Sequence, residues 1–313
     1  MNKRDAVLNV VDTSKPQETI PAAFFLHFDQ RHHEGSAAIE KHLEYFRYTG
    51  MDFVKIQYEK VFPHLSQIKR PQDWARMPLY RKDFYQPQLE VVAGLVKAAK
   101  SEALVLQTLY SPFMCAGHTT SDSLVTQHIQ QDPEAVKKGM EIITESLMIF
   151  VKECVRLGVD GFYHSTQGGE AHRFQQPALF QECVKPYDLI LMNEIKRTCL
   201  FNILHVCDYQ DSYDDLTPFL DYPGHVVNCN PQVGQRKLSG TEISQSFGRP
   251  YMGGLERKGI LATGSSEAVR QEVQSVLRES PPRFILAADC TVPSETSWDN
   301  LKTAIQTAHD WKR

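Results

Sequence analysis

Short apolar segments and amphipathic helical segments alternate eight times along this chain of 313 residues, and this alternation most constrains the fold. The apolar segments have the length of buried strands, and the segments between them have helical spacing of apolar residues. The predicted strands cover 21–28, 52–58, 103–109, 159–165, 199–204, 225–229, 250–254 and 283–288. The predicted helices cover 35–48, 89–100, 132–157, 177–197, 214–220, 238–247, 265–279 and 298–311. Eight such units over about 290 residues predict a (β/α)8 TIM barrel.

Capping residues support several of these helix boundaries. Asp132 followed by Pro133 is a typical helix start, and Gly158 is a typical stop for the same helix. The segment 111–132, which precedes this helix, is expected to consist mainly of loops. The runner-up architecture is a doubly wound open sheet, but such a sheet normally has a glycine-rich turn after its first strand. Here DQRHH (29–33) follows the first predicted strand instead.

Composition excludes several classes of function. The net charge is −4 and no basic stripe is present, so we expect no nucleic-acid partner. No apolar run approaches the roughly 20 residues that span a bilayer, so we expect no membrane segment. Residues 1–20 are expected to form a polar leader without the apolar core of a signal peptide, and 21–313 a single barrel domain. These features predict a cytoplasmic protein whose seven cysteines are thiols or metal ligands rather than disulfides.

The end of the fifth predicted strand carries the strongest chemical signal. His205 and Cys207 are two residues apart, so an extended chain presents them on the same face. A catalytic zinc site uses three protein ligands and keeps one position open. Cys290, which follows the eighth predicted strand, is the candidate for the third ligand, and Cys229 is the second choice. The alternative is that His205 bonds a carbonyl while the thiols pack in the barrel, as buried cysteines often do.

Other polar residues follow the predicted strands, where the catalytic residues of a barrel gather. His27 and Arg31 follow the first strand, and Arg31 is a candidate for binding a carboxylate or sulfonate. Glu59 follows the second strand and His164 ends the fourth, so each is a candidate for substrate contact or for the open metal position. Asp208 is expected to be a solvated loop residue, although it stands next to Cys207.

Five segments resemble the uroporphyrinogen decarboxylases and their relatives. They are VDGFYHS (159–165), LHVC (204–207), VNCN (227–230), YMGGLERKGIL (251–261) and ILAADCTVP (285–293), and the resemblance covers roughly residues 20–313 in matching order. The resemblance implies a (β/α)8 barrel with its site at the C-terminal mouth. Decarboxylases of this family use an aspartate near the second strand and arginines near the first. The position similar to that aspartate is Tyr58, a candidate catalytic residue here, and only Arg31 represents the arginines.

A second branch of the family resembles this chain more closely in its motifs. Corrinoid-dependent methyltransferases, such as methylcobamide:coenzyme M methyltransferases, carry His-x-Cys followed far downstream by Cys, which His205, Cys207 and Cys290 match. The resemblance implies a zinc ion that binds a thiol acceptor, a small-molecule substrate, and either a corrinoid protein or a methylated small molecule as the methyl donor. The predicted function is a zinc-dependent methyl or alkyl transferase. A cofactor-free decarboxylase and a zinc-stabilised binding protein for a corrinoid or small molecule are the alternatives.

Overall fold

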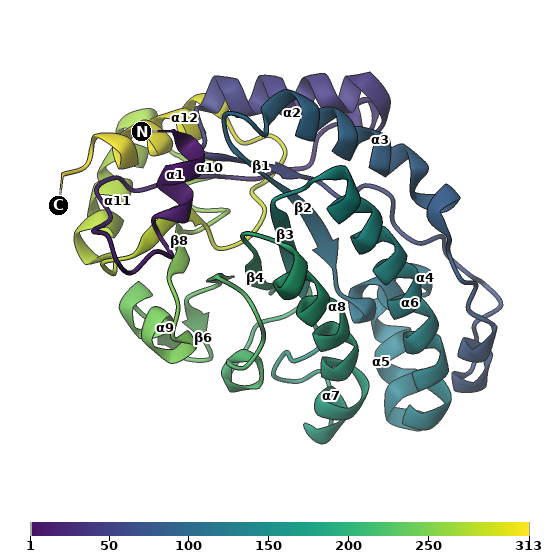
Figure 1. The fold of residues 1–313 in the computed structure, drawn as a ribbon. Coiled ribbons are helices and arrows are strands. Elements are labelled where there is room, and N and C mark those ends of the chain that lie inside the picture. The colour runs from purple at the N-terminus through teal and green to yellow at the C-terminus, as the bar shows by residue number, and fades with distance from the viewer. Residues whose placement is uncertain (1, 313) are drawn as a thin grey trace.

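Seven parallel strands curve around a central axis with helices outside them, as Figure 1 shows for the computed structural model, which describes residues 2–312. The strands pair in the order β1-β2-β3-β4-β5-β8-β9. Their bounds are β1 Phe53–Ile56, β2 Leu104–Tyr110, β3 Gly161–Thr166, β4 Ile203–Val206, β5 Val226–Cys229, β8 Tyr251–Leu255 and β9 Phe284–Ala288. The predicted α/β barrel is confirmed.

The first predicted strand closes this ring without forming a regular strand. Ala22 makes an isolated parallel bridge to Leu286 of β9, and the amide of Ala23 donates to the Leu286 carbonyl at 3.1 Å. On the other side, the amide of Asp52 donates to the carbonyl of Ala22 at 3.0 Å, just before β1 begins. Residues 21–23 therefore occupy the eighth position of the barrel. The rest of the predicted strand, 24–28, does not pair with a neighbouring strand.

Most predicted helices form near their expected bounds. They are α2 Gly35–Thr49, α3 Lys82–Ala99, α6 Pro133–Leu157, α8 Lys185–Thr198, α9 Gly240–Phe247, α11 Ser266–Glu279 and α12 Trp298–Asp310. The carboxylate of Asp132 caps α6 by accepting from the amide of Ala135, and Gly158 ends the helix with a φ of +95°. Helix α3 begins seven residues earlier than predicted, because Pro87 is accommodated inside it.

Three predictions about connecting segments are wrong. The supposed loop 111–132 contains two helices, α4 Pro112–Thr119 and α5 Asp122–Gln131, whose first turns are capped by the hydroxyls of Ser111 and Ser121. The helix predicted over 177–197 is divided at Val184 into α7 Ala178–Cys183 and α8. The helix predicted over 214–220 is only a 3-10 turn, Thr217–Phe219. Shorter elements are the 3-10 turns Gln30–His32 and Pro71–Arg76, helix α10 Ile260–Thr263, and the hairpin β6 Gln232–Val233 with β7 Arg236–Lys237.

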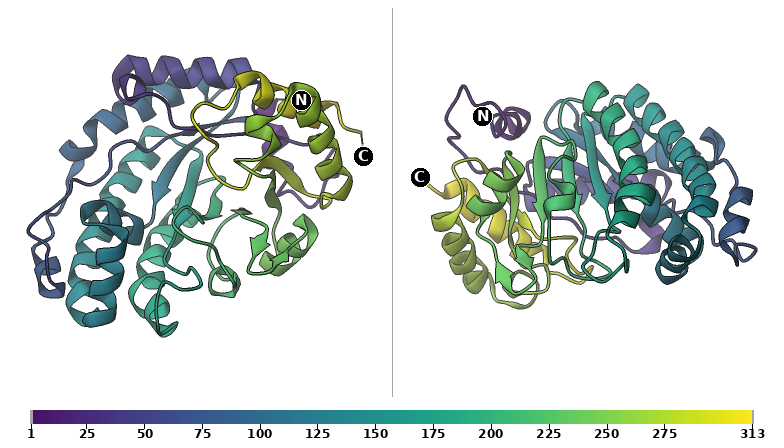
Figure 2. Two further views of the ribbon diagram at one scale, coloured as in Figure 1. Left: turned by 180° about the vertical axis from the view of Figure 1, so that it is seen from behind. Right: turned by 90° about the horizontal axis from the view of Figure 1, so that it is seen from below.

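A short N-terminal helix, α1 Lys3–Leu8, packs under the barrel at the end where the strands begin. The guanidinium of Arg4 binds both carboxylate oxygens of Asp160 at 2.8 and 2.9 Å, and Asp160 directly precedes β3. Val7 and Val10 are completely buried. The polar composition of residues 1–20 does not predict this helix. Both ends of the chain lie on the same side of the molecule (Figure 2).

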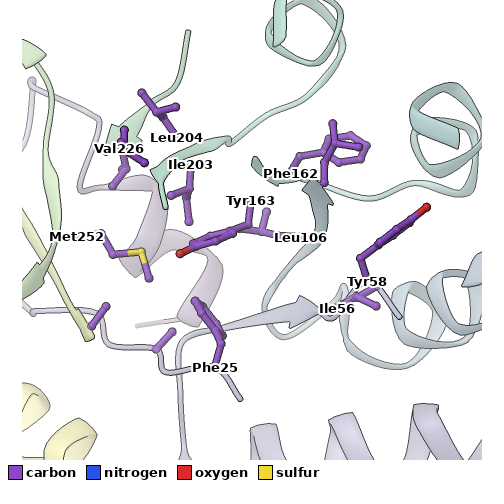
Figure 3. Close-up of a cluster of buried hydrophobic side chains, with 14 of the residues drawn as sticks. Phe25, Ile56, Tyr58, Leu106, Phe162, Tyr163, Ile203, Leu204, Val226 and Met252 are labelled. Carbon is purple, nitrogen blue, oxygen red and sulfur yellow. The ribbon is translucent and has the colours of Figure 1, made fainter. Parts of the chain in front are cut away.

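The barrel interior is aromatic as well as aliphatic. Figure 3 shows Phe25, Tyr163 and Met252 pointing toward one another inside the ring, whereas Phe162 lies on the other side of β3. The Tyr163 hydroxyl donates to Oδ1 of Asn228, at 2.6 Å, across the interior. Since alternate side chains of a strand face opposite sides, residues 163 and 165 of β3 face inward and residues 162, 164 and 166 face the helices. No helix within residues 2–312 is long and apolar enough to cross a lipid bilayer.

Candidate metal centre and active-site cavity

A cavity of about 830 Å³ opens at the C-terminal ends of the strands. Most of its wall comes from the strands and the loops that follow them, which is where a barrel places its catalytic groups, and Met114 and His118 of α4 complete it. Its wall includes His27, Lys55, Thr108, Tyr110, Tyr163, Ser165, His205, Cys207, Arg257, Lys258 and Cys290. The structure thus brings His27 and the three predicted metal ligands to one cavity.

His205, Cys207 and Cys290 form a compact group of potential ligands. One ligand atom from each residue lies within 4.8 Å of the other two, and Nε2 of His205 is 3.4 Å from Sγ of Cys290. All three side chains are at most 8% exposed, yet all three line the cavity. The described residues contain no further group of this kind.

This donor set fits zinc. Imidazole nitrogen and thiolate sulfur are ligands that zinc prefers, and three protein donors beside an open cavity match the pattern of a catalytic rather than a structural site. Nδ1 of His205 is buried without a hydrogen-bond partner among the described residues. The ring instead packs against that of Tyr163, with the two ring centroids 5.0 Å apart and an interplanar angle of 31°. Cys229, the second choice, lies outside the group.

The two cysteines of the group are chemically unequal. A hydrogen bond from Cys290 lowers the pKa of the Cys207 thiol below its usual value, and burial opposes this effect. The same hydrogen bond, together with burial, raises the pKa of Cys290. The side-chain amide of Gln167 also donates to Sγ of Cys207 at 3.4 Å. Cys207 is therefore the thiol that loses its proton first.

Asp208 is not the solvated loop residue that was expected. Its carboxylate binds Nη1 of Arg257 at 2.8 Å and the amide of Asn230 at 2.6 Å, and its side chain is only 8% exposed. Arg257 also pairs with Asp289, the residue before Cys290. The segment that carries Cys207 and the segment that carries Cys290 are therefore attached to one arginine.

A buried lysine faces the same cavity. The ammonium of Lys55 donates to Oε1 of Gln57 at 2.6 Å and lies over the rings of Phe25 and Tyr163, at 4.6 and 4.8 Å from their centroids. Burial lowers the pKa of Lys55 to about 7, although the charges of Cys290, Glu59 and Cys207 act to raise it. Lys55 is thus an amine that gives up its proton near neutral pH and is electrostatically coupled to the thiols of Cys207 and Cys290.

His27 and Glu59 form a pair beside the cavity, whereas Arg31 stands apart. Nδ1 of His27 is 3.1 Å from Oε1 of Glu59, and His27 lines the cavity. Burial acts to raise the pKa of Glu59, but the hydrogen bond from His27 and neighbouring positive charges lower it overall. The side chain of Arg31 is 81% exposed, binds Asp29 at 2.9 Å and does not line the cavity.

Tyr58 and His164 also lie away from the cavity wall. Tyr58 is 1% exposed and packs edge-on against Tyr110 and Phe150. Its hydroxyl has no hydrogen-bond partner among the described residues. His164 is completely buried on the helix-facing side of β3, and neither ring nitrogen has a partner within the described chain. Burial lowers the pKa of His164 to about 3, so its ring is neutral.

Lys55 and Arg257 were missed by the sequence analysis, although each left a signal. Lys55 is a charged residue inside the predicted strand 52–58, and a charge in a buried strand calls for a partner or a role. Arg257 follows the seventh predicted strand, at the end where barrels place function. Its partners Asp208 and Asp289 come from other strand ends, which only the closed ring brings together.

The geometry defines the class of protein: an α/β barrel with a histidine–dicysteine group at its mouth. This chain belongs to the uroporphyrinogen decarboxylase (URO-D) family, which it matches over residues 45–311. The superfamily resemblance seen in the sequence is thereby confirmed. No curated protein matches the chain by sequence.

Solved structures share the fold at low identity. A methyltransferase from Methanosarcina mazei superposes with a TM-score of 0.75 at 13% identity, covering 98% of each chain. A putative vitamin-B12-independent methionine synthase from Listeria monocytogenes superposes with a TM-score of 0.57 at 13% identity, over 88% of this chain and 86% of its own. A B12-independent methionine synthase from Shewanella sp. W3-18-1 gives 0.55 at 12% identity, over 93% and 94% of the two chains. At such identities the comparison establishes the fold alone.

Proposed function

We propose that this protein is a zinc-dependent methyl or alkyl transferase that activates a thiol acceptor. The observation that carries this proposal is the convergence of His205, Cys207 and Cys290 within 4.8 Å at the wall of an open cavity. The proposal is supported by structural neighbours that are named as a methyltransferase and as methionine synthases. Methionine synthesis is itself methylation of a thiol, so these neighbours and the donor set point to the same chemistry.

The reaction exchanges a bond to the donor for a bond to sulfur. The acceptor loses its S–H proton, its sulfur forms a bond to the methyl carbon, and the donor keeps the electron pair of the bond that breaks. His205, Cys207 and Cys290 would hold zinc, which when bound lowers the pKa of a thiol so that the thiolate persists at neutral pH. The donor in this proposal is a corrinoid or a methylated small molecule.

Residues of the chain itself would assist this transfer in two ways. The Lys55 amine lies in the interior without an ion-pair partner among the described residues, so in its protonated form it favours an anionic sulfur in the cavity. His27 stands at the cavity wall and is paired with Glu59, so it can receive the acceptor's proton and pass it to solvent. A corrinoid protein, if it is the donor, would meet the cavity at Tyr209, whose ring is 75% exposed.

Methyl transfer from free methylcobalamin to a panel of thiols tests the proposal. The zinc-loaded protein, incubated anaerobically with methylcobalamin and either 2-mercaptoethanesulfonate or homocysteine, should form the thioether as methylcobalamin is consumed. Cys290→Ser should abolish the transfer. A wild-type protein that binds no zinc, or a Cys290→Ser variant with undiminished transfer, would contradict the proposal. Tight corrinoid binding without transfer to any thiol would favour a binding protein instead.

Decarboxylation is the second candidate, because the family takes its name from that reaction. Cations on the cavity wall, Lys55, Arg257 and Lys258, would suit a substrate with several carboxylates. The aspartate expected of the decarboxylases is replaced by Tyr58, which lies away from the cavity wall. Anaerobic incubation with uroporphyrinogen decides this point, and a lack of coproporphyrinogen would count against the candidate.

A further inference from the structure

We propose that Arg257 is a positioning residue that holds Cys207 and Cys290 in their metal-binding arrangement. Arg257 lies in the loop after β8, and its side chain joins the residue after Cys207 to the residue before Cys290. This inference rests on the proposed zinc site. It concerns how the apoprotein prepares that site rather than which residues bind the metal.

The Cys207 segment is attached to Arg257 through Asp208. Nη1 of Arg257 binds Oδ1 of Asp208 at 2.8 Å, and the amide of Asn230 donates to Oδ2 at 2.6 Å. Both carboxylate oxygens are therefore engaged, which fixes the side chain in one orientation. The carbonyl of Cys207 accepts from the hydroxyl of Tyr213 at 3.0 Å. On the other side, the amide of Cys207 donates to the carbonyl of Thr166 at 3.0 Å, so the backbone is held both before and after the Cys207 Cα.

The Cys290 segment is attached to the same arginine through Asp289. The backbone amide of Arg257 donates to Oδ1 of Asp289 at 2.9 Å, and Nη1 lies 3.3 Å from Oδ2. The amide of Asp289 donates in turn to the carbonyl of Leu255 at 2.9 Å. Asp289, the residue before Cys290, consequently binds both the backbone amide and the side chain of Arg257.

The sheet alone does not fix the distance between the two thiols. Strands β4 and β9 are separated by β5 and β8, and both cysteines lie beyond the last paired residue of their strands. Arg257 supplies a direct link across this gap. It also places a positive charge beside two carboxylates that are at most 8% exposed in their side chains, and these would otherwise repel each other and the thiolates nearby.

The chain offers a matched control for this role. Arg249 stands just before β8, at the opposite end of the strand from Arg257. Its guanidinium is also largely buried, and it donates to the carbonyls of Leu220, Tyr222 and Gly224. Loss of Arg249 therefore removes a comparable number of hydrogen bonds next to the same strand, far from His205, Cys207 and Cys290.

Metal affinity of the full-length apoprotein tests the inference. Zn²⁺ affinity is measured by competition with a chromophoric chelator, Co²⁺ is used as a spectroscopic probe of thiolate ligation, and thermal unfolding is followed for each variant. We expect Arg257→Met to weaken Zn²⁺ binding by about 10- to 100-fold, the range seen when groups that orient metal ligands are removed. Its cobalt–thiolate absorption should also be weaker. Arg249→Met should lose stability but keep wild-type affinity.

Arg257→Lys keeps the test decisive if Arg257→Met does not fold. Arg257 contacts both carboxylates through Nη1, and lysine retains the positive charge without the geometry of the guanidinium, so we expect an intermediate loss of affinity. If folded Arg257→Met and Arg257→Lys bind Zn²⁺ as tightly as the wild type, the positioning role is wrong while the zinc site stands. If the wild type itself binds no Zn²⁺, the proposed function fails first.

Discussion

Nε2 of His205 and Sγ of Cys290 lie 3.4 Å apart, although 85 residues separate them along the chain. The strands that carry them are not neighbours, because β5 and β8 lie between β4 and β9. The two side chains meet only because the sheet curves and both point toward the same cavity. The group of His205, Cys207 and Cys290 therefore forms only when the barrel closes, and no local segment contains all three residues.

Removal of any one donor should release the metal. We expect His205→Ala, Cys207→Ser and Cys290→Ser to lower the zinc content from about one ion per chain to a small fraction, since a catalytic site has only three protein ligands. Elemental analysis of protein purified without added zinc measures this. Cys229→Ala is the matched control, because Cys229 is equally buried but lies outside the group. Equal zinc content in all four variants would refute the assignment.

Replacement of Lys55 should affect activity and stability in opposite directions. Lys55→Met removes a buried amine whose pKa falls from 10.5 to about 7 on folding. Between these two pH values the unfolded chain binds a proton that the folded chain lacks, so the buried amine destabilises the wild type. Near pH 7 the free energy of unfolding of the variant should therefore be a few kcal/mol higher than that of the wild type, and this difference should shrink toward pH 10.5. Thiol methylation should fall by roughly tenfold or more, since one pKa unit of thiolate stabilisation is lost. Unchanged methylation kinetics would remove Lys55 from the mechanism.

His164 should govern acid sensitivity rather than catalysis. The pKa of His164 is lowered from 6.5 to about 3 by burial, so the unfolded chain binds more protons between these values. Stability should therefore decline as the pH falls from 6.5, by about 3 kcal/mol at pH 4 from this residue alone. His164→Leu should reduce that decline and leave zinc content and methyl transfer unchanged. Urea unfolding at pH 7 and pH 4 measures the effect, and a large loss of activity at pH 7 would restore His164 as a catalytic candidate.

The N-terminal helix should stabilise the barrel from below. Arg4→Met leaves the carboxylate of Asp160, whose side chain is 3% exposed, without its bidentate partner. Loss of one partner of a buried pair typically costs about 3 kcal/mol or more. Chemical denaturation should show this loss, while zinc content stays that of the wild type because the helix lies at the opposite end from the cavity. A variant as stable as the wild type would mean that α1 contributes little.

Periodicity and strand-end chemistry predicted the features that repeat along the chain. The alternation of strands and helices was sufficient for the barrel, and the pair His205 and Cys207 was sufficient to suspect a metal. The family resemblance then favoured Cys290 over Cys229. The strand register agrees with this choice, because it turns Asn228 inward opposite His205 and leaves Cys229 on the other side. His205, Cys207 and Cys290 thus lie together in the structure, although that register could not be read from the sequence.

Features that depend on tertiary contact were not predictable in this way. Helices α4 and α5 are short, and their start signals, Ser111 and Ser121, also suit loops. Arg31 is the arginine nearest the first strand end in sequence, yet its side chain turns to Asp29 and solvent. Lys55 reaches the cavity instead, because β1 directs it into the barrel interior.

The bridge between Ala22 and Leu286 has a consequence for how a newly made chain matures. The ring can close only after β9 has left the ribosome, and Cys290 follows within a few residues. A nascent chain therefore carries His205 and Cys207 without Cys290 while residues 208–289 are being added. The group of His205, Cys207 and Cys290 can therefore assemble only after β9 has been made, and a chain that stops short of β9 lacks both the closing bridge and Cys290.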